Sequence, residues 1–441
     1  MKRNNCIGRI KRVYYESYGC PSNRFDLEVM LGRLVEAGLN LTRKVDQADI
    51  ILINTCGVKT PTESRMLERI RVLSKYGRPM IIAGCLPRIN LEALRKVIGK
   101  RTVMLDPHTV DRIVEAVRYL EEGGDIKILF SDKPSIKTAL SKIRINPAIE
   151  IVQIAEGCAG ACSYCCVRFA RGKLFSYPQK VILQRIEEAV SAGVKEIWIT
   201  SQDNGAYGLD RNTSLSDLLK RIVEIQGDFY IRVGMMNPQH VKRILRSLID
   251  VYKNSKIFKF LHIPLQSGDN NVLRLMNRYY TVEDFKNIVM TFREDIPKIT
   301  IATDVIVGFP GESREAFNHT LNIIEEIKPD IVNVSRFFPR PGTPAKDMQP
   351  IPYDELKNRS KLASKVSLRV SLERNKLWKG WEGHIIIDEK GKGSSWIGRN
   401  FAYKPIVIKS EHKNLIGKIA WVRVTEVHET YLKADLLKFE S

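Results

Sequence analysis

The fold is decided by the stretch Glu156-Gly-Cys-Ala-Gly-Ala-Cys-Ser-Tyr-Cys-Cys166. Its cysteines Cys158, Cys162 and Cys165 follow a CxxxCxxC pattern that can surround one small inorganic group. Thiolates are soft ligands, which suit zinc or an iron–sulfur cluster. A closed structural zinc site takes four ligands, and no histidine lies near enough in the sequence to complete one. A four-iron cluster held by three thiolates instead keeps one iron open for a substrate or cofactor.

Cys166 directly follows the last cysteine of this pattern. Side chains of neighbouring residues diverge, so Cys166 would complete a four-ligand site only with awkward geometry. The alternative interpretation is a group of buried structural cysteines. It fits poorly, because the stretch is rich in Gly and Ala and lacks the large apolar residues of a core segment.

The composition indicates several domains, a cytoplasmic location and a polyanionic partner. The 441 residues suffice for roughly two to four domains. The net charge of +21 favours nucleic acid as the partner, although a basic source proteome would give the same charge. No apolar segment follows the basic N-terminus, and no apolar run is long enough to span a membrane. In such a protein the eight cysteines are expected to be ligands or reactive thiols rather than disulfides.

The N-terminal part alternates strand-like and helix-like segments, which predicts a parallel sheet covered by helices on both faces. Asn23 is the expected cap of the first helix. The predicted strands are 13–18, 49–54 and 79–83, and the predicted helices are 25–37, 62–75 and 91–98.

One cysteine follows each of these three predicted strands, within two residues of its end: Cys20, Cys56 and Cys85. The carboxyl ends of parallel strands share one edge of the sheet, where ligands bind. We therefore expect three thiolates from three loops to converge in a second metal site. The alternative, three unrelated buried cysteines, makes their common placement a coincidence. Cys6 lies outside the pattern and is not expected to be a ligand.

The central part is predicted to be a partial (β/α) barrel that begins at Ile149, after a glycine- and proline-bearing linker. Barrel chemistry occurs at the carboxyl ends of the strands, and the CxxxCxxC loop follows the first strand. Polar loops at 201–205, 264–268 and 308–312 follow the second, fourth and fifth strands and can hold a charged, nucleoside-like cofactor. The predicted strands are 149–154, 196–200, 229–233, 258–263, 299–307 and 331–337.

The C-terminal part begins with a basic segment and continues as short β-strands. Residues 356–379 contain eight basic residues and one acidic residue, Glu373, which predicts a helix with a cationic face. A solvated face is the commoner explanation, but a neighbouring nucleic-acid module favours phosphate contact. The β-segments within 380–439 predict a five-stranded barrel resembling an OB-fold. Residues 396–404 mix aromatic and basic side chains, which suits RNA stacking and phosphate binding; the alternative is that these aromatics are core.

Nearly the whole chain resembles the methylthiotransferases, a branch of the radical S-adenosylmethionine (SAM) superfamily. The resemblance rests on CxxxCxxC with Tyr164 before its last cysteine, on Ser17–Asn23, Asn54–Glu63 and Gly84–Pro87, and on a C-terminal part that resembles the TRAM domain. It implies four segments: an N-terminal methylthiotransferase domain (1–125), a linker (126–148), a radical SAM domain (149–375) and a TRAM domain (376–441).

Within this family the chain resembles the archaeal and eukaryotic enzymes that act on N6-threonylcarbamoyladenosine at position 37 of tRNA. The motifs are Phe169–Gly172 with Ser176–Pro178, Thr200–Gly208 and Val58–Glu63. The resemblance implies insertion of a methylthio group at C2 of this adenine in the tRNA anticodon stem-loop. The alternatives are a methylthiotransferase acting on isopentenyladenosine or on a ribosomal protein, or, from another class, a non-catalytic metal-containing RNA-binding protein.

The resemblance also implies two [4Fe-4S] clusters and their division of labour. The cluster of Cys158, Cys162 and Cys165 would cleave SAM to a 5′-deoxyadenosyl radical, and the cluster of Cys20, Cys56 and Cys85 would carry the sulfur to be inserted. One SAM would methylate that sulfur and another would supply the radical. A flavodoxin- or ferredoxin-like electron donor and a sulfur source are implied as partners. The expected SAM contacts are Tyr164, Gln202, Gln266 and Ser267.

Overall fold

A computed structural model describes residues 10–440 of the chain, so Cys6 lies outside the described residues. The chain divides into two compact units. The first unit contains the residues up to Ile145, Ile151–Ile182 and Phe338–Lys346, and the second contains Asn146–Glu150, Leu183–Phe337 and the residues from Asp347 onward. None of the helices within residues 10–440 has the length and apolar character needed to cross a membrane.

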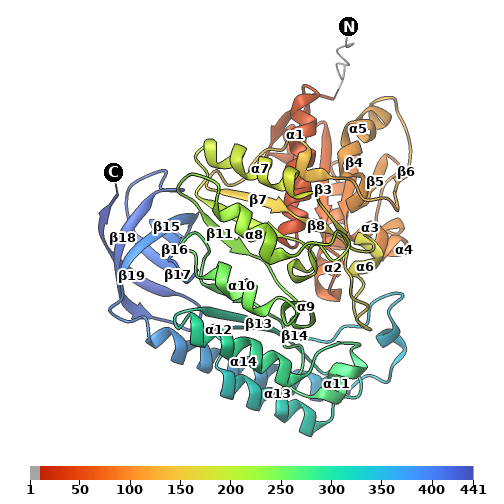
Figure 1. The fold of residues 1–441 in the computed structure, drawn as a ribbon. Coiled ribbons are helices and arrows are strands. Elements are labelled where there is room, and N and C mark those ends of the chain that lie inside the picture. The colour runs from red at the N-terminus through yellow and green to blue at the C-terminus, as the bar shows by residue number, and fades with distance from the viewer. Residues whose placement is uncertain (1–9, 441) are drawn as a thin grey trace. The chain divides into compact units, whose positions relative to one another are not determined.

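The first unit is built on a six-stranded sheet in the order β2-β1-β3-β4-β5-β6, in which all neighbours are parallel (Figure 1). Its central strands β3 and β4 are buried along their whole length, which explains their continuous apolar sequences. This sheet confirms the predicted parallel architecture. The strands are β1 (Arg12–Ser17), β2 (Asn40–Thr42), β3 (Ile50–Thr55), β4 (Met80–Gly84), β5 (Thr102–Leu105) and β6 (Lys127–Leu129).

Helices cover both faces of this sheet. One face packs against α1 (Pro21–Glu36) and α5 (Ile113–Glu121) through apolar side chains such as Leu34 and Val117. The other packs against α2 (Thr60–Ser74) and α4 (Leu91–Arg95) through Ile70 and Leu94. The sequence patterns missed β2, β5, β6 and α5, and β6 lies in the segment that was expected to be a linker.

The prediction that Asn23 caps the first helix is wrong. The helix α1 begins at Pro21, whose fixed φ favours the first helical position, and Cys20 is the residue before it. Asn23 lies inside the first turn, where its side-chain amide donates hydrogen bonds to the carbonyls of Tyr18 (2.9 Å) and Thr55 (2.8 Å). It therefore joins the ends of β1 and β3, directly below two cysteine loops.

The second unit contains parallel strands separated by helices, as a partial (β/α) barrel requires (Figure 1). The order is β11-β10-β7 in one sheet and β12-β13-β14 in the next. A parallel bridge joins Ile231, in β11, to Ile257, which precedes β12. The strand β7 (Ile149–Gln153) begins in this unit. The six strands confirm the predicted barrel; the others are β10 (Glu196–Thr200), β11 (Tyr230–Val233), β12 (Phe260–His262), β13 (Thr300–Val307) and β14 (Ile331–Arg336).

The helices of this barrel follow the strands in sequence. A longer helix, α14 (Tyr353–Lys376), leads to the C-terminal strands and exposes Lys357, Lys361 and Lys365 at a spacing of four, which confirms its cationic face. The other helices include α7 (Gln179–Ser191), α8 (Leu215–Val223), α10 (Leu245–Tyr252), α12 (Val282–Asp295) and α13 (Arg314–Ile327).

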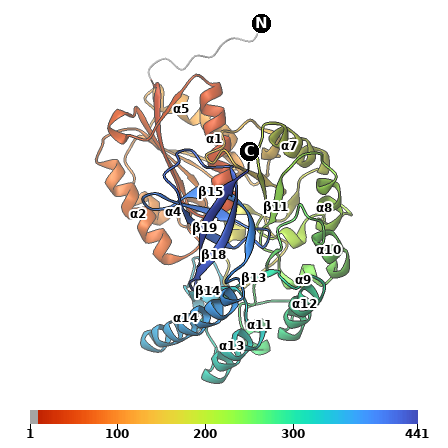
Figure 2. The same cartoon turned by 90° about the vertical axis from the view of Figure 1, so that its left-hand side faces the viewer.

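The C-terminal strands close into a barrel in the order β15-β16-β17-β19-β18, coloured blue in Figure 2. Closure leaves no free sheet edge, and the interior is filled by apolar side chains such as Ile387, Ile406 and Val422. This confirms the predicted five-stranded barrel. The strands are β15 (Glu382–Lys390), β16 (Ser395–Arg399), β17 (Pro405–Lys409), β18 (Ile419–Val427) and β19 (Leu432–Phe439).

The prediction that residues 396–404 form an RNA-stacking surface is wrong. Trp396 is 5% exposed and belongs to the barrel core, and Tyr403 packs with Phe258 and Phe260. Lys404 is buried, and its Nζ donates to Asp330 Oδ1 at 2.8 Å. The inward alternation of β16 therefore places Trp396 in the core, and a buried ion pair with Asp330 occupies Lys404.

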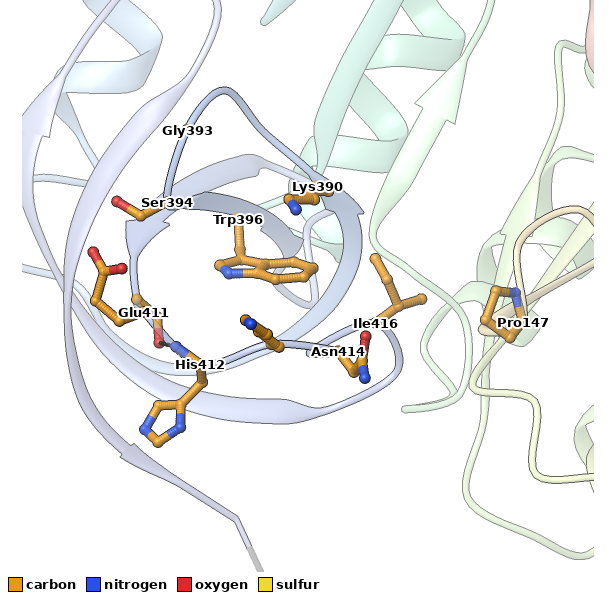
Figure 3. A pocket seen from close by; sticks show the side chains of 11 residues that line it. Pro147, Lys390, Gly393, Ser394, Trp396, Glu411, His412, Asn414 and Ile416 are labelled. Atoms are coloured by element: carbon orange, nitrogen blue, oxygen red, sulfur yellow. Dashed lines mark hydrogen bonds between the residues drawn. The ribbon is translucent and has the colours of Figure 1, made fainter. Parts of the chain in front are cut away.

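Trp396 nevertheless borders a cavity of about 710 Å³ between the loops around Gly393 and Lys413 (Figure 3). The Lys390 ammonium lies 5.7 Å from the centre of its ring. Trp396 thus lines this cavity although its side chain is buried. The half-buried residues of this segment are Ile397, Arg399 and Phe401.

Candidate functional site

The dispersed cysteines lie on three neighbouring loops at the carboxyl edge of the first unit's sheet. Cys20, Cys56 and Cys85 follow β1, β3 and β4, which are adjacent strands. The register aligns Ser17 with Asn54 and Thr55 with Gly84, so each cysteine comes shortly after a paired position. The sheet, rather than the local sequence, therefore brings these three residues together.

Two glycines allow the close approach of these loops. Gly19 has a φ of +110°, and a Cβ there would lie 2.9 Å from the Cβ of Cys56 and 3.3 Å from its Sγ. Gly84 has a φ of +98°, and a Cβ there would lie 2.3 Å from the Thr55 carbonyl oxygen. Positive φ and these short distances both require glycine, so the turns before Cys20 and Cys85 are fixed by it.

The three thiols of this set influence one another electrostatically. Burial raises the pKa of the Cys85 thiol to about 12, and the charges of Cys20 and Cys56 add to that shift. Burial also raises the pKa of Cys56, again with a contribution from Cys20. Thiols in this state are protonated, and a metal group that binds them must displace the protons.

The contiguous cysteines lie in the loop after β8 (Ala155–Glu156), in the same unit of the chain. A Cβ at Gly160 would lie 3.4 Å from the Sγ of Cys158 and 3.9 Å from that of Cys162. The Gly160 N–H donates to the Sγ of Cys158 at 3.2 Å. Both sulfurs therefore converge on the backbone of Gly160.

The third thiol of this loop is within electrostatic range of the other two. Burial raises the pKa of Cys165 to about 12, with contributions from Cys162 and Cys158. At the base of the loop, the Cys158 N–H donates to the Gly172 carbonyl at 3.2 Å. This single backbone hydrogen bond joins the first cysteine of the loop to Gly172 and closes the base of the loop.

The donor chemistry of both sets fits an iron–sulfur cluster. All seven cysteines between residues 10 and 440 are free thiols. In that part of the chain, no three His, Cys, Asp or Glu side chains converge closely enough to hold a single metal ion. A single zinc ion needs all its ligands around one atom, whereas a cluster binds each thiolate through a different iron and suits a wider set.

A buried group of four charges, hereafter the charged tetrad, lies beneath the two cysteine sets. It consists of Asp26, Lys137, Glu156 and Arg171, each no more than 1% exposed. Lys137 Nζ lies 2.5 Å from Asp26 Oδ1 and 2.9 Å from Glu156 Oε1. Arg171 lies 2.6 Å from Asp26 Oδ2 and 2.9 Å from Glu156 Oε1. Two cations and two anions therefore balance within the core.

Arg171 connects this tetrad with the dispersed cysteines. Its guanidinium donates to Asn23 Oδ1 at 2.7 Å, and the Cys85 thiol donates to the same oxygen at 3.5 Å. The Arg171 charge lowers the pKa of Cys85 and Cys56, against the larger effect of burial. Sequence reasoning missed the tetrad, because its members are far apart in the chain and a buried charge has no periodic signal.

Cys166 is a packing residue in this structure. It is 1% exposed and belongs to an apolar cluster with Cys85 and Ala170. Its thiol donates weakly to the Gly57 carbonyl at 3.8 Å. Arg340 donates to the same carbonyl at 2.6 Å, so the loop after Cys56 is fixed from two sides.

The expected SAM contacts are distributed over both units. Tyr164 is half-buried in the CxxxCxxC loop of the first unit. In the second unit, Gln202 follows β10, and Gln266 and Ser267 follow β12, at carboxyl ends as predicted. Gln266 is buried with a φ of +64°, and its backbone is fixed by hydrogen bonds to Asp304 (2.8 Å) and from Ile306 (3.0 Å). Their role as cofactor contacts stays a prediction.

Comparison with protein families matches three parts of the chain. Residues 12–106 match the uncharacterized protein family UPF0004, residues 152–324 match the radical SAM superfamily, and residues 379–437 match the TRAM domain. Among solved structures, a radical SAM methyltransferase, TsrM, from Kitasatospora setae is similar over 76% of this chain and 75% of its own, with a TM-score of 0.56 and 14% identity. This likeness concerns the fold alone.

Curated proteins resemble the chain along nearly its whole length. The probable threonylcarbamoyladenosine tRNA methylthiotransferase of Pyrococcus horikoshii is 40% identical over 97% of this chain and 99% of its own. The one of Methanothermobacter thermautotrophicus is 40% identical over 96% and 99%. The threonylcarbamoyladenosine tRNA methylthiotransferase of Homo sapiens is 34% identical over 98% of this chain and 75% of its own. The chain therefore belongs to the threonylcarbamoyladenosine tRNA methylthiotransferase family of radical SAM enzymes.

Proposed function

We propose that this enzyme adds a methylthio group to C2 of N6-threonylcarbamoyladenosine 37 in the anticodon stem-loop of tRNA. One observation carries the proposal: two sets of three free thiols lie in one compact unit, on loops whose approach depends on glycine. We take the substrate from the relatives, because the match with this chain covers 99% of their length.

We assign one [4Fe-4S] cluster to each cysteine set. Cys158, Cys162 and Cys165 hold the first, and Cys20, Cys56 and Cys85 hold the second. Bound clusters of this kind, together with SAM, supply the radical that attacks C2 and the sulfur that is inserted there. Tyr164, Gln202, Gln266 and Ser267 contact SAM. The left-handed backbone of Gln266 supports this role, since strained positions of non-glycine residues cluster at ligand sites.

The residues around the thiols prepare the site for an anionic group. The Gly160 N–H points at the Cys158 sulfur, and a backbone donor of this kind stabilises negative charge on sulfur. Arg171 brings a guanidinium to the dispersed set, and its charge favours thiolates over thiols. Cys85 and Cys166 are buried, which excludes water from the inner side of the dispersed set, whereas Cys20 is exposed.

The TRAM barrel and the cationic face of α14 would bind the tRNA backbone. Exposed lysines at Lys357, Lys361 and Lys365 provide charges for phosphate contact. The reaction also needs a flavodoxin- or ferredoxin-like electron donor and a sulfur source. We assign the activity to the cytoplasm, where reducing conditions preserve free thiols.

The test is anaerobic reconstitution with iron and sulfide, followed by metal counting and incubation with SAM, a strong reductant and RNA. We expect about eight irons per chain, as two four-iron clusters require, and release of 5′-deoxyadenosine. Stem-loop RNAs with threonylcarbamoyladenosine, isopentenyladenosine or adenosine at position 37 are compared by mass analysis of the product nucleosides.

Two results would contradict the proposal. Methylthiolation of the isopentenyladenosine RNA, or of a ribosomal protein, instead of the threonylcarbamoyladenosine RNA would show that the enzyme has a different substrate. Bound zinc without SAM cleavage would instead favour a non-catalytic RNA-binding protein.

A further inference from the structure

A cavity of about 480 Å³ in the first unit lies beside the CxxxCxxC loop and has no role in the assignments above. It is bounded by the N-terminal domain on one side and by the segment that follows the cysteine loop on the other. The lining residues that matter here are Arg88, His108, Asp132, Arg168, Phe169 and Lys173.

The charge of this cavity is positive, and two of its cations are available. Arg88 is already bound to Asp106 (2.7 Å) and Asp132 (3.0 Å). Arg168 and Lys173 are exposed, and their side chains form no ion pair or hydrogen bond with any other residue between 10 and 440. Unpaired cations at a concave surface favour an anionic ligand.

The same cavity presents an aromatic face. Phe169 is 46% exposed, although most large apolar side chains of this unit are buried. A Cβ built at Gly342 would lie 3.3 Å from its ring, so the segment of Gly342 supports the phenyl group from one side. A ring held on one side and open on the other is a platform on which a base can stack.

Short connections join the cavity to both cysteine sets. Lys173 pairs with Cys158 in an isolated β-bridge, and the Phe169 N–H donates to the Cys166 carbonyl at 3.1 Å. Arg88 lies three residues after Cys85, in the helix α3 (Leu86–Ile89). The walls of the cavity therefore continue directly into the loops of both cysteine sets, which suits the binding of a reacting nucleotide.

We propose that this cavity recognises the N6 substituent of the substrate adenosine: Arg168 and Lys173 bind the carboxylate of the threonylcarbamoyl group, and Phe169 stacks on the base. The inference rests on the proposed function. An isopentenyl group has no charge and would gain nothing from these cations, so the cavity explains a preference for the threonylcarbamoyl substrate. SAM is also an adenosine with a carboxylate. We assign the cavity to RNA because its cations and its ring are exposed to a macromolecule arriving from solvent.

The test is a binding measurement with the anaerobically reconstituted full chain. Two anticodon stem-loop RNAs, identical except for adenosine or threonylcarbamoyladenosine at position 37, are titrated by fluorescence anisotropy. We expect the wild type to prefer the modified RNA about tenfold, as one charged hydrogen-bonded contact provides. Arg168→Met and Lys173→Met should lose most of this preference, and Arg168→Lys should keep part of it.

Two further variants separate stacking and general charge from recognition. Phe169→Ala should lower the affinity for both RNAs by the same factor. The matched control Arg78→Met removes an exposed arginine at the opposite, amino end of β4, and should leave the preference unchanged. Circular dichroism checks that each variant is folded.

Three results would overturn the inference. They are an equal loss of affinity for both RNAs in Arg168→Met, a wild type without any preference, and loss of SAM binding in Arg168→Met by equilibrium dialysis. The wild-type product assay distinguishes this failure from failure of the proposed function. If the enzyme methylthiolates the threonylcarbamoyladenosine RNA but the variants keep their preference, only the cavity assignment is wrong.

Discussion

The two cysteine sets offer the same chemistry but depend on different levels of structure. Cys158, Cys162 and Cys165 lie within eight residues of one loop, whereas Cys20, Cys56 and Cys85 span 66 residues. The contiguous set needs only its loop and the hydrogen bond between Cys158 and Gly172. The dispersed set needs the register of three strands and the glycine turns before two of its members. A local motif is therefore visible in the sequence, and a tertiary one becomes visible only after the sheet has been predicted.

The difference also determines which changes in the chain disrupt the geometry of each cysteine set. A change outside the loop leaves the contiguous thiols at their spacing, since the chain itself holds them. Any change in the packing of β1, β3 or β4 separates the dispersed thiols. The charged tetrad links the two sets, because Glu156 precedes one and Arg171 reaches the other.

The largest effect is expected from single cysteine replacements. Cys158→Ala should abolish SAM cleavage, because a cluster with two protein thiolates no longer holds its open iron in place. Cys56→Ala should retain cleavage and lose methylthiolation. The measurements are release of 5′-deoxyadenosine and formation of the methylthio nucleoside. The iron content of each variant should fall to about half of the wild-type value.

Cys166→Ala is the matched control, since this thiol packs without being assigned to a cluster. The two-cluster assignment is wrong if Cys56→Ala still methylthiolates RNA.

The next effect concerns the link between the sets. Arg171→Met leaves Asp26 and Glu156 with a single cation, Lys137, in the core. Breaking a buried ion pair in this way costs about 3–5 kcal/mol. We expect a lower free energy of unfolding in chemical denaturation and reduced iron at the dispersed set.

Arg171→Lys keeps the charge and should lose less stability than the methionine variant, while Arg78→Met should be neutral. Equal stability of Arg171→Met and wild type would show that the tetrad does not hold the sets together.

A smaller and more selective effect is expected from glycine replacements. Gly19→Ala places a Cβ against Cys56 in a backbone conformation that alanine avoids, so iron at the dispersed set should fall. Gly160→Ala brings ordinary contacts with the sulfurs of Cys158 and Cys162 and should retain its cluster. Gly38→Ala shares the positive φ but meets open space, and so isolates the cost of conformation alone.

Iron counting and SAM cleavage are the readouts for all three variants. Loss of SAM cleavage in Gly19→Ala would mean that the two sets are not independent.

Much of this architecture could be predicted because its signals are periodic or local. Buried strands of the parallel sheets are continuous apolar runs, and the cysteines follow their ends. The exceptions have physical causes. Pro21 displaced the expected cap at Asn23, and the alternation of β16 turned Trp396 into the barrel. The buried ion pairs of Arg171 and Lys137 could not be predicted, because nothing in a sequence marks a cation that is buried against two distant carboxylates.

The smallest effect expected per step is the pH dependence of stability that arises in the second unit. It matters for the comparison of the two cysteine sets, because their iron content has to be measured at a pH where the whole chain is stable. Burial, with the nearby charge of Asp388, raises the pKa of Glu196 from 4.5 to about 8. Trp198 donates to this carboxyl at 3.0 Å, and Arg399, which pairs with Asp388, opposes the shift. The folded state thus holds a proton that the unfolded state releases.

The resulting stability is complete below about pH 4.5 and is lost as the pH rises through about 8. Between about pH 5 and 8 the wild type should become less stable by about 1 kcal/mol per pH unit. Glu196→Gln, which resembles the protonated acid, should flatten this slope, and exposed Glu188→Gln should keep it. Thermal unfolding at several pH values measures both. If the slope survives in Glu196→Gln, it arises from other titratable groups, and loss of iron at high pH can then no longer be separated from the stability of the whole chain.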